Sequence, residues 1–257
     1  MKYIRFQTEV GPRWGVVEDN RVRVLAKAPY DTLCYTGETL PFADCKLLEP
    51  VEPTKIVCVG KNYYDHAVEM GEGIPETPIL FLKGPNVLSA PGTAITAPEF
   101  VTRVDYEGEL GVVIRKRAKA VKAADALDYV LGYTCFNDVT ARVIQKSDGQ
   151  WTRGKSMDGF GPCGPWITDE ADPADLTVTT RLNGKVVQQS RTGLLMRDVP
   201  QLIEFITASM TLEPGDLIAT GTPAGIGPMY DGDRVTVEIE GVGILENPIV
   251  LPQSPRS

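Results

Sequence analysis

The sequence predicts an α+β fold that is made mainly of β-strands. Short segments with the alternating or apolar patterns of strands recur along all 257 residues, whereas only a few stretches have the spacing of an amphipathic helix. Strand and helix patterns do not alternate regularly, as they would in a parallel sheet built from βαβ units. The chain is long enough for one large domain, or for one domain with a small one beside it.

The first fifty residues predict a small N-terminal β domain. Its three strand-like segments are residues 2–7, 13–19 and 21–26. Residues 18–21, "EDNR", suit a turn between the second and third segments. Two prolines within residues 47–55 then mark a boundary. We therefore expect a small β domain over residues 1–50 and a main domain over residues 51–257.

The main domain is predicted to be rich in strands, with a few helices. Strand patterns occur in residues 55–60, 105–116, 131–138, 176–190, 216–221 and 234–250. Helical spacing occurs in residues 62–69, 122–130, 138–146 and 198–210. Asn183 and Gly184 favour the tight turn of a hairpin within residues 176–190. Gly71 is expected at the C-terminal end of the first helix.

Composition and charge argue against several classes of partner. The chain has 26 Lys and Arg residues against 34 Asp and Glu residues, and its formal net charge is −8. Nucleic acids and anionic membranes attract basic surfaces, so we expect neither as a partner. The first ten residues lack the apolar core of a signal peptide, and no apolar run is long enough to span a bilayer. A cytoplasmic location is therefore expected.

The five cysteines and the single histidine restrict the metal chemistry. The cysteines are Cys34, Cys45, Cys58, Cys135 and Cys163. They are widely spaced and form no C-x-x-C motif, so we expect reduced thiols rather than a disulfide framework or a zinc site. With one histidine and no paired cysteines, a metal would need oxygen ligands. Oxygen ligands favour Mg²⁺, Mn²⁺ or Ca²⁺ over zinc.

The stretch "VDYEGELGVVI", residues 104–114, carries acids at alternate positions. Side chains two apart on a strand share a face, so Asp105, Glu107 and Glu109 would project together. They fit the solvated face of an edge strand or, if they are buried, a site for a cation, because neighbouring carboxylates repel one another. The apolar run after Glu109 indicates a strand buried on both faces, which favours the cation site.

Asp138 supplies a further acid between a predicted strand and a predicted helix. It suits either the N-cap of that helix or a ligand of the cation. Arg142 and Gln145 lie four and seven residues later, so on a helix they would share a face with Asp138. A carboxylate, a guanidinium and an amide on one face suit the binding of an anionic, metal-bound substrate.

Two glycine-containing segments allow more than one interpretation. Residues 149–156, from Gly149 to Ser156, match the spacing of a nucleotide-binding phosphate loop. A helical pattern precedes them and a stretch rich in glycine and proline follows, which is the wrong context for that loop. Lys155 within the segment is either a fixed cation or an exposed loop lysine. Residues 219–229, "ATGTPAGIGPM", form either a tight turn or a backbone that approaches a ligand closely.

His66 is the only histidine in the chain and lies three residues before Glu69. On the helix predicted over residues 62–69, this spacing puts both side chains on one side. The pair is either a surface histidine with a chance neighbour or a base whose imidazole is oriented by the glutamate.

Five motifs occur in the order and spacing of the fumarylacetoacetate hydrolase family, which the chain resembles. They are "GKNYYDHAVEMG", "DYEGELGVVI", "NDVTARVIQ", "RGKS" and "TGTPAGIGP". The likeness to the catalytic domain of that family covers about residues 55–248. The first fifty residues resemble the small N-terminal β domain of many bacterial members. The resemblance implies a mixed β-roll with peripheral helices, and it implies a homodimer.

The resemblance also implies a metal-dependent active site. The motifs make Glu107, Glu109 and Asp138 the ligands of Mg²⁺ or Mn²⁺. The residues that match the substrate-lining positions of the family are Arg142, Gln145, Lys155 and Thr222. Lys155 would also take part in catalysis as an electrophile.

The reaction follows from the same resemblance. In the hydrolytic members, the helix holding His66 and Glu69 is a lid that brings this pair over a 2-oxo acid substrate. We expect C–C bond hydrolysis of an acylpyruvate or another β-diketo acid through a metal-bound enolate, with water activated by the pair. Related proteins instead decarboxylate or tautomerise oxaloacetate, or decarboxylate and isomerise unsaturated 2-oxo dicarboxylates of aromatic catabolism. The same ligands serve all of these reactions, so the alternatives stay open.

Overall fold

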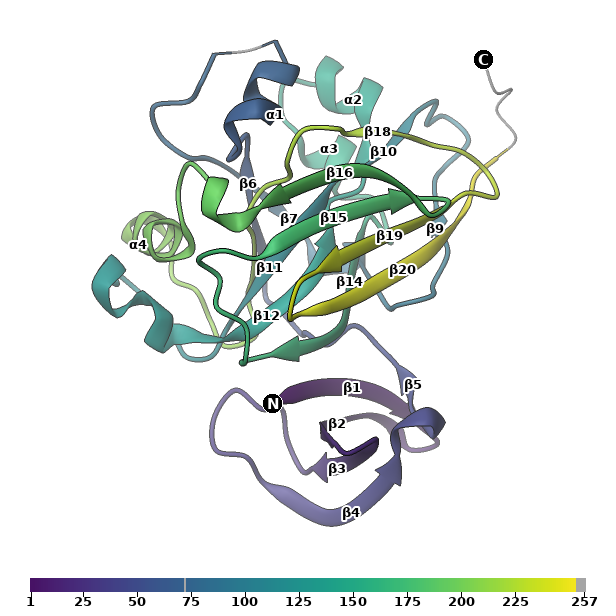
Figure 1. The fold of residues 1–257 in the computed structure, drawn as a ribbon, viewed down its shortest axis with the longest axis vertical. Coiled ribbons are helices and arrows are strands. Elements are labelled where there is room, and N and C mark those ends of the chain that lie inside the picture. Colours follow the sequence, from purple (N-terminus) through teal and green to yellow (C-terminus); the bar gives the residue numbers. More distant parts are fainter. Residues whose placement is uncertain (72, 253–257) are drawn as a thin grey trace.

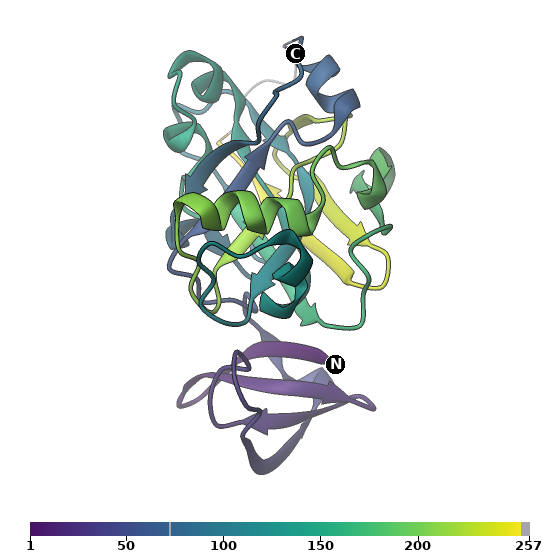
Figure 2. The same ribbon diagram turned by 90° about the vertical axis from the view of Figure 1, so that its left-hand side faces the viewer.

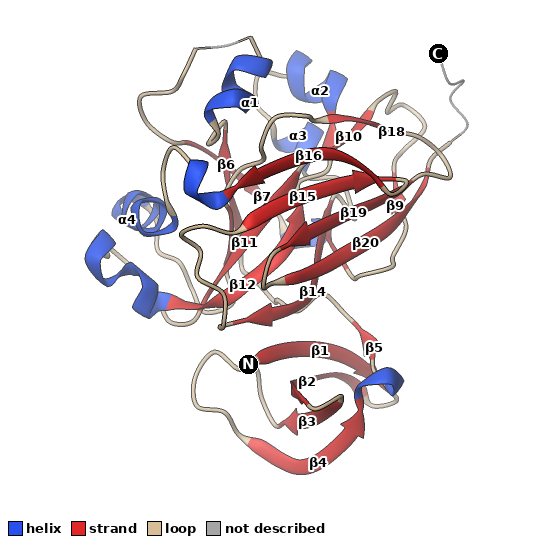
Figure 3. Ribbon diagram, viewed as in Figure 1, coloured by secondary structure: helices blue, strands red, loops and turns tan. Residues whose placement is uncertain are grey.

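The computed structural model describes residues 1–71 and 73–252 (Figure 1). Within these residues the chain is mainly β, and its few helices lie at the periphery of the sheets (Figure 3). The predicted α+β, mainly β class and the β-rich roll with peripheral helices are therefore confirmed. The main domain predicted over residues 51–257 includes a short C-terminal stretch, residues 253–257, that lies outside the described part of the chain.

The N-terminal strands form a cluster at one end of the molecule (Figure 1). The elements are β1 (Lys2–Thr8), β2 (Gly11–Glu18), β3 (Arg21–Leu25), β4 (Tyr35–Pro41), the 3-10 helix η1 (Phe42–Asp44) and β5 (Lys46–Leu47). The turn predicted over residues 18–21 is confirmed, since Asp19 and Asn20 both have a positive φ, as a two-residue hairpin turn requires. The sequence pattern does not predict β4, because most of its residues are exposed and it has no apolar face.

One large sheet continues from these strands into the rest of the chain. Its further strands are β6 (Ile56–Gly60), β7 (Ile79–Lys83), β8 (Leu88–Ser89), β11 (Gly108–Ile114), β12 (Val130–Asn137), β14 (Gly161–Thr168) and β17 (Leu217–Ala219). The main path through the sheet is β4-β3-β2-β1-β14-β12-β11-β17-β6-β7. β1 joins β14 through the pairs Lys2–Thr168 and Tyr3–Ile167. The division into two domains at residue 50 stays a prediction.

Two smaller sheets complete the β structure. One contains β16 (Lys185–Arg191), β15 (Thr177–Leu182), β19 (Arg234–Ile239), β20 (Gly243–Val250) and β9 (Ile95–Thr96). The other contains β13 (Thr140–Ala141), β10 (Val104–Tyr106) and β18 (Gly227–Met229). The predicted hairpin is confirmed: β15 and β16 pair antiparallel around Asn183 and Gly184, which both have a positive φ.

The helices are short and peripheral. They are α1 (Tyr64–Glu69), α2 (Arg142–Ser147), α3 (Thr152–Lys155) and α4 (Val199–Ser209), with the 3-10 helices η2 (Pro85–Val87), η3 (Ala123–Tyr129) and η4 (Thr192–Leu194). The helices predicted over residues 62–69 and 198–210 are confirmed, within the usual uncertainty of helix ends. The helix predicted over residues 122–130 is of the 3-10 type. No helix within residues 1–71 and 73–252 is long and apolar enough to cross a membrane.

The helix predicted over residues 138–146 begins only at Arg142. The preceding β13 (Thr140–Ala141) pairs with β10 instead, which takes its backbone out of a helical conformation. Asp138 therefore does not open a helix, and the shared helical face predicted for Asp138, Arg142 and Gln145 was wrong.

The strand predicted over residues 105–116 is broken at Glu107. β10 ends at Tyr106 and β11 begins at Gly108, and the two strands belong to different sheets. The backbone N–H of Glu107 donates to the side-chain oxygen of Asn137 at 3.0 Å. The break therefore places the acids before and after it in different surroundings.

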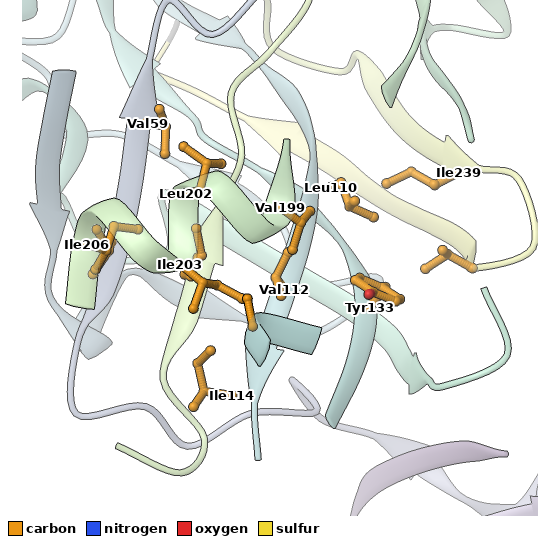
Figure 4. Close-up of a cluster of buried hydrophobic side chains, with 14 of the residues drawn as sticks. Val59, Leu110, Val112, Ile114, Tyr133, Val199, Leu202, Ile203, Ile206 and Ile239 are labelled. Atoms are coloured by element: carbon orange, nitrogen blue, oxygen red, sulfur yellow. The ribbon is translucent and has the colours of Figure 1, made fainter. Parts of the chain in front are cut away.

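The largest hydrophobic cluster of the described residues extends from α4 across strands of the large sheet to the five-stranded sheet, where Ile239 belongs to it (Figure 4). Its members include Val59, Leu110, Val112, Leu202 and Ile206. The helix starts with a capping box, in which Asp198 accepts the backbone N–H of Gln201 and the Gln201 side chain accepts that of Asp198. Such a cap contributes about 1 kcal/mol. Figure 2 shows α4 beside η3. Both helices contribute to the cluster that contains Leu110 and Val112 of β11, the strand that carries part of the candidate site.

Candidate active site

A pocket is lined by residues of α1, α2, α3 and β11 and by the segment after β17. The predicted site residues that line it are His66, Glu107, Glu109, Asp138, Arg142, Gln145, Lys155 and Thr222. Glu69 contacts His66 within α1. The structure thus brings together all nine predicted residues, although they come from widely separated segments.

Three carboxylates meet in this pocket. Glu109 lies in β11 and Glu107 immediately before it, while Asp138 directly follows β12, the antiparallel partner of β11. The pairing of Gly108 with Asn137 brings the two segments together, and the backbone N–H of Asp138 donates to the carbonyl of Glu107 at 2.8 Å. One oxygen of each carboxylate lies within 4.8 Å of the others, and all three residues are buried. The pairing of β11 with β12 therefore creates the cluster.

Lys155 offsets part of the negative charge. Its Nζ donates to Glu107 Oε2 at 2.6 Å and to Asp138 Oδ2 at 2.5 Å. Burial by itself raises the pKa of Glu107, but Lys155 and Arg142 outweigh it and hold that pKa below its usual range. Burial, followed by the charges of Asp138 and Glu107, raises the pKa of Glu109 well above its usual value. An added cation would favour the ionised form of Glu109.

Arg142 is held between two acids. Its Nε donates to Asp105 at 2.9 Å, its Nη1 donates to Gln145 at 3.3 Å, and its Nη2 contacts Glu107. Asp105 is fully buried and also accepts two hydrogen bonds from Arg103, at 2.7 and 3.0 Å. The prediction that Asp105 projects with the other two acids was wrong, because the chain breaks at Glu107 and Asp105 turns toward the arginines. Asp105 positions Arg142.

Lys83 is a residue of the site that the sequence analysis missed. It lies at the end of β7 and is almost completely buried. Its ammonium donates to Asp138 Oδ1 at 2.5 Å and to the carbonyls of Phe160 and Val139 at 2.7 and 3.2 Å. These bonds orient Asp138 and offset its charge. The signal in the sequence is a lysine within the apolar stretch "ILFLKGP", where a buried charge needs a partner.

The glycine-rich segment after β17 contacts the carboxylate cluster. The backbone N–H of Gly221 donates to Glu109 Oε2 at 2.8 Å. Gly221 has a φ of +104° and no room for a Cβ, so a glycine is required there. The Thr222 hydroxyl donates to the carbonyl of Gly108 at 3.0 Å and accepts from the Gln188 side chain at 2.8 Å. This hydroxyl is therefore open to a ligand only as an acceptor.

His66 and Glu69 form a pair within α1. Nδ1 of His66 lies 3.1 Å from Glu69 Oε2, and His66 is buried. The same carboxylate accepts the backbone N–H of Gly225 at 3.0 and 3.2 Å, which ties α1 to the glycine-rich segment. Because an ionised carboxylate only accepts hydrogen bonds, Nδ1 is the donor in this pair, and Nε2 is the ring nitrogen left for another partner.

The geometry does not favour the phosphate-loop interpretation of Gly149 to Ser156. α2 precedes this segment, where a phosphate loop would follow a strand, and α3 within it has only four residues. The ammonium of Lys155 contacts Glu107 and Asp138. It therefore serves the carboxylate cluster.

The donor set fits a hard divalent cation. The cluster offers carboxylate oxygens from Glu107, Glu109 and Asp138, and the five cysteines are free thiols outside it. Mg²⁺, Mn²⁺ and Ca²⁺ all prefer oxygen ligands. A positive charge here would offset the burial and the neighbouring carboxylate charges that together raise the pKa of Glu109. We propose these three residues as ligands of Mg²⁺ or Mn²⁺.

The fold and the site together define a β-rich protein with a buried carboxylate cluster and a histidine–glutamate pair at one pocket. A family model described as fumarylacetoacetate (FAA) hydrolase C-terminal matches residues 55–250, and one described as Rv2993c-like, N-terminal matches residues 1–50. The chain belongs to the fumarylacetoacetate hydrolase family, a family of enzymes.

Similar proteins differ in the reactions that their names give. Protein Rv2993c of Mycobacterium tuberculosis is 50% identical over 244 residues, which are 94% of this chain and 92% of that protein. Oxaloacetate tautomerase YisK of Bacillus subtilis is 41% identical over 239 residues, 87% of this chain and 79% of that protein. The solved structure of a 2-hydroxyhepta-2,4-diene-1,7-dioate isomerase from Mycobacterium marinum is 46% identical, with a TM-score of 0.91, and covers 99% of this chain and 100% of its own.

Proposed function

We propose that this chain catalyses proton transfer at the carbon next to the keto group of a 2-oxo acid, and so interconverts keto and enol forms or moves a double bond. The observation that carries the proposal is the contact between Glu69 and the buried His66, which lines the pocket that holds the carboxylate cluster. The names of two relatives, a tautomerase and an isomerase, support it, because both reactions move a proton in such a substrate.

The residues of the pocket have different roles in this reaction. Arg142 and Gln145 would bind the substrate's carboxylate, and the ammonium of Lys155 would stabilise the negative charge that develops on the keto oxygen. A divalent cation held by the carboxylate cluster would polarise the keto group as a Lewis acid.

The base in this scheme is Nε2 of His66. It takes a proton from C3, the electron pair of that C–H bond forms a C2–C3 double bond, and the carbonyl π electrons move onto the oxygen. Returning the proton to the oxygen gives the enol, and returning it to a more distant carbon of a conjugated chain shifts the double bond. Glu69 stabilises the imidazolium that forms between the two steps.

The second candidate is the C–C bond hydrolysis expected from the sequence, which the description of the matching family model favours. The same pair would activate water for attack on the distal carbonyl of an acylpyruvate. The C–C bond would break with its electrons on the pyruvate carbon, which then takes a proton. The products would be pyruvate and a carboxylic acid. Hydrolysis of acylpyruvates stays a prediction.

The test supplies oxaloacetate, fumarylpyruvate and a short acylpyruvate separately, with Mg²⁺, and follows enol absorbance, pyruvate and CO₂. The proposal predicts equilibration of enol and keto oxaloacetate well above the spontaneous rate, without release of pyruvate, and with deuterium exchange at C3 in heavy water. Pyruvate release from acylpyruvates would favour hydrolysis, and CO₂ release would favour decarboxylation. The absence of any accelerated exchange or equilibration would overturn the proposal.

The assembly and location of the enzyme are also proposals. We propose that it acts as a homodimer on a small 2-oxo acid, as the family resemblance implies. We propose a cytoplasmic location because the unpaired cysteines suit a reducing compartment. Light scattering on the purified protein tests the dimer.

A further inference from the structure

We infer that Gln188 is a positioning residue of the active site, which holds the hydroxyl group of Thr222 in a single orientation for contact with a bound 2-oxo acid. The inference rests on the proposed function, which places such an acid in the pocket that Thr222 lines.

Gln188 comes from a different sheet than the residues that it contacts. It lies in β16 of the five-stranded sheet, whereas Gly108 begins β11 of the large sheet and Thr222 follows β17 of the same large sheet. Gln188 is only 1% exposed and is not part of the pocket lining. A polar side chain that is buried so deeply needs hydrogen-bond partners. Gln188 can therefore affect a ligand only through the residues that it contacts.

The partners of Gln188 determine how its amide group is turned. Oε1 accepts the backbone N–H of Gly108 at 3.1 Å, and Nε2 donates to the hydroxyl of Thr222 and to the carbonyl of Pro223, both at 2.8 Å. A backbone N–H only donates and a backbone carbonyl only accepts, so Gly108 and Pro223 exclude the flipped amide. The amide oxygen and both amide hydrogens are thus engaged.

The orientation of this amide determines the orientation of the Thr222 hydroxyl. The hydroxyl oxygen accepts from Gln188, and the hydroxyl hydrogen goes to the carbonyl of Gly108 at 3.0 Å. The three residues form a closed ring of hydrogen bonds that begins at the N–H of Gly108 and ends at its carbonyl. A free hydroxyl rotates to suit its neighbours, whereas this one is held, with one lone pair left for a ligand. A binding group that is already ordered loses less freedom when the ligand arrives, which favours affinity.

The ring of hydrogen bonds adjoins the carboxylate cluster. Gly108 separates Glu107 from Glu109 in the sequence. Thr222 directly follows Gly221, whose backbone N–H donates to Glu109 at 2.8 Å. The ring therefore connects the strand that carries the proposed metal ligands with the glycine-rich segment that lines the pocket.

The test is a double-mutant cycle between Gln188 and Thr222. Gln188→Met removes the amide but keeps the length and neutrality of the side chain, and Thr222→Val removes the hydroxyl but keeps the shape. Calorimetric titration in saturating Mg²⁺ measures the dissociation constant of pyruvate, the probe, for the parent, both single variants and the double variant. Each single change should weaken binding by roughly fivefold, as for the loss of one hydrogen bond. The double variant should bind about as well as either single variant, because both changes remove the same contact.

Two control variants separate this role from a general effect on the fold. Thr222→Ser keeps the hydroxyl, so Gln188→Met should still weaken binding by roughly fivefold in that background. Gln189→Met makes the same change one position along β16, where the side chain is exposed, and should leave pyruvate binding unchanged. Thermal unfolding shows whether each variant is folded. If Gln188→Met does not fold, Gln188→Glu takes its place in the cycle, because it keeps the shape and loses both amide hydrogens.

The inference is overturned if the two effects multiply, to roughly twenty-five-fold in the double variant, because Gln188 would then act independently of the hydroxyl. It is also overturned if either single variant binds pyruvate like the parent, or if the parent does not bind pyruvate. The proposed function is judged separately, by C3 deuterium exchange in oxaloacetate with the parent enzyme. Coupled effects without exchange would support the role of Gln188 in binding while the proposed function fails, and exchange with multiplying effects would have the opposite meaning.

Discussion

Nδ1 of His66 lies 3.1 Å from the carboxylate of Glu69, and that carboxylate also accepts the backbone N–H of Gly225. One glutamate therefore orients the only histidine and fastens α1 to the glycine-rich segment that contacts Glu109 through Gly221. This arrangement is what a lid would have in its closed position. We expect α1 to be mobile when no substrate is bound, as the family resemblance to a lid implies.

Replacing His66 by alanine should lower turnover by roughly a hundredfold or more, because a general base contributes about that much. The effect is measured as the steady-state rate on whichever of oxaloacetate, fumarylpyruvate and the acylpyruvate proves to be a substrate. Mg²⁺ affinity, measured by calorimetry, should not change, since imidazole is not a proposed ligand. Glu69→Gln should lie between the parent and His66→Ala. A parental rate in His66→Ala would show that another group is the base.

Breaking the contact between Glu69 and Gly225 should expose His66. Gly225 has a φ of +98°, and a Cβ there would lie 2.2 Å from the carbonyl oxygen of Val187, so Gly225→Ala must displace its N–H. His66 is only 5% exposed, and its reaction with diethyl pyrocarbonate should therefore be slow in the parent, faster in Gly225→Ala and slowed by a bound 2-oxo acid.

The matched control for this experiment is Gly232→Ala. Gly232 also has a positive φ, +80°, but its Cβ would meet nothing within 4 Å. It imposes similar backbone strain away from the site. Equal modification rates in both variants would argue that the Gly225 contact does not hold α1 in place.

Removal of the cation should abolish turnover. Excess EDTA should reduce the rate to background, and Mg²⁺ or Mn²⁺ should restore it, because the cluster offers carboxylate oxygens. Asp105→Asn is an informative comparison, since Asp105 holds Arg142 and is outside the cluster. It should weaken substrate binding while Mg²⁺ affinity, followed by calorimetry, is kept. Full activity in excess chelator would contradict the proposed metal site.

Local patterns predicted the elements whose signals lie within one segment. The helix α4 has its cap and its apolar spacing in the sequence, and the β15–β16 hairpin has Asn183 and Gly184 at its turn. The strand β4 has an exposed, polar sequence, so no pattern marks it. Its existence depends on pairing with β3, which a local pattern does not show.

The site was predictable as a set of residues but not as a geometry. Alternation identified Glu107 and Glu109, whereas the position of Asp138 depends on the pairing of β11 with β12. Lys83 was missed because its bond to Asp138 joins positions 55 residues apart. Asp105 was misplaced because a strand pattern does not reveal the break at Glu107. The order of the five motifs indicated the site residues through the family resemblance. Sequence spacing alone does not show which residues far apart in the chain are in contact.

The metal-free protein should become less stable as the pH rises above the usual pKa of a glutamate, about 4.5. The raised pKa of Glu109 means that the folded chain keeps a proton that the unfolded chain releases, so the unfolding free energy falls with pH through the folded pKa. The lowered pKa of Glu107 acts only below that value, where its contribution is lost with falling pH. In EDTA, the melting temperature of the parent should therefore fall more steeply between about pH 5 and pH 8 than that of Glu109→Gln. Mg²⁺ should restore the parent at the upper pH but have little effect on Glu109→Gln, whereas parallel melting curves for the two proteins would rule out Glu109 as the source of the pH dependence.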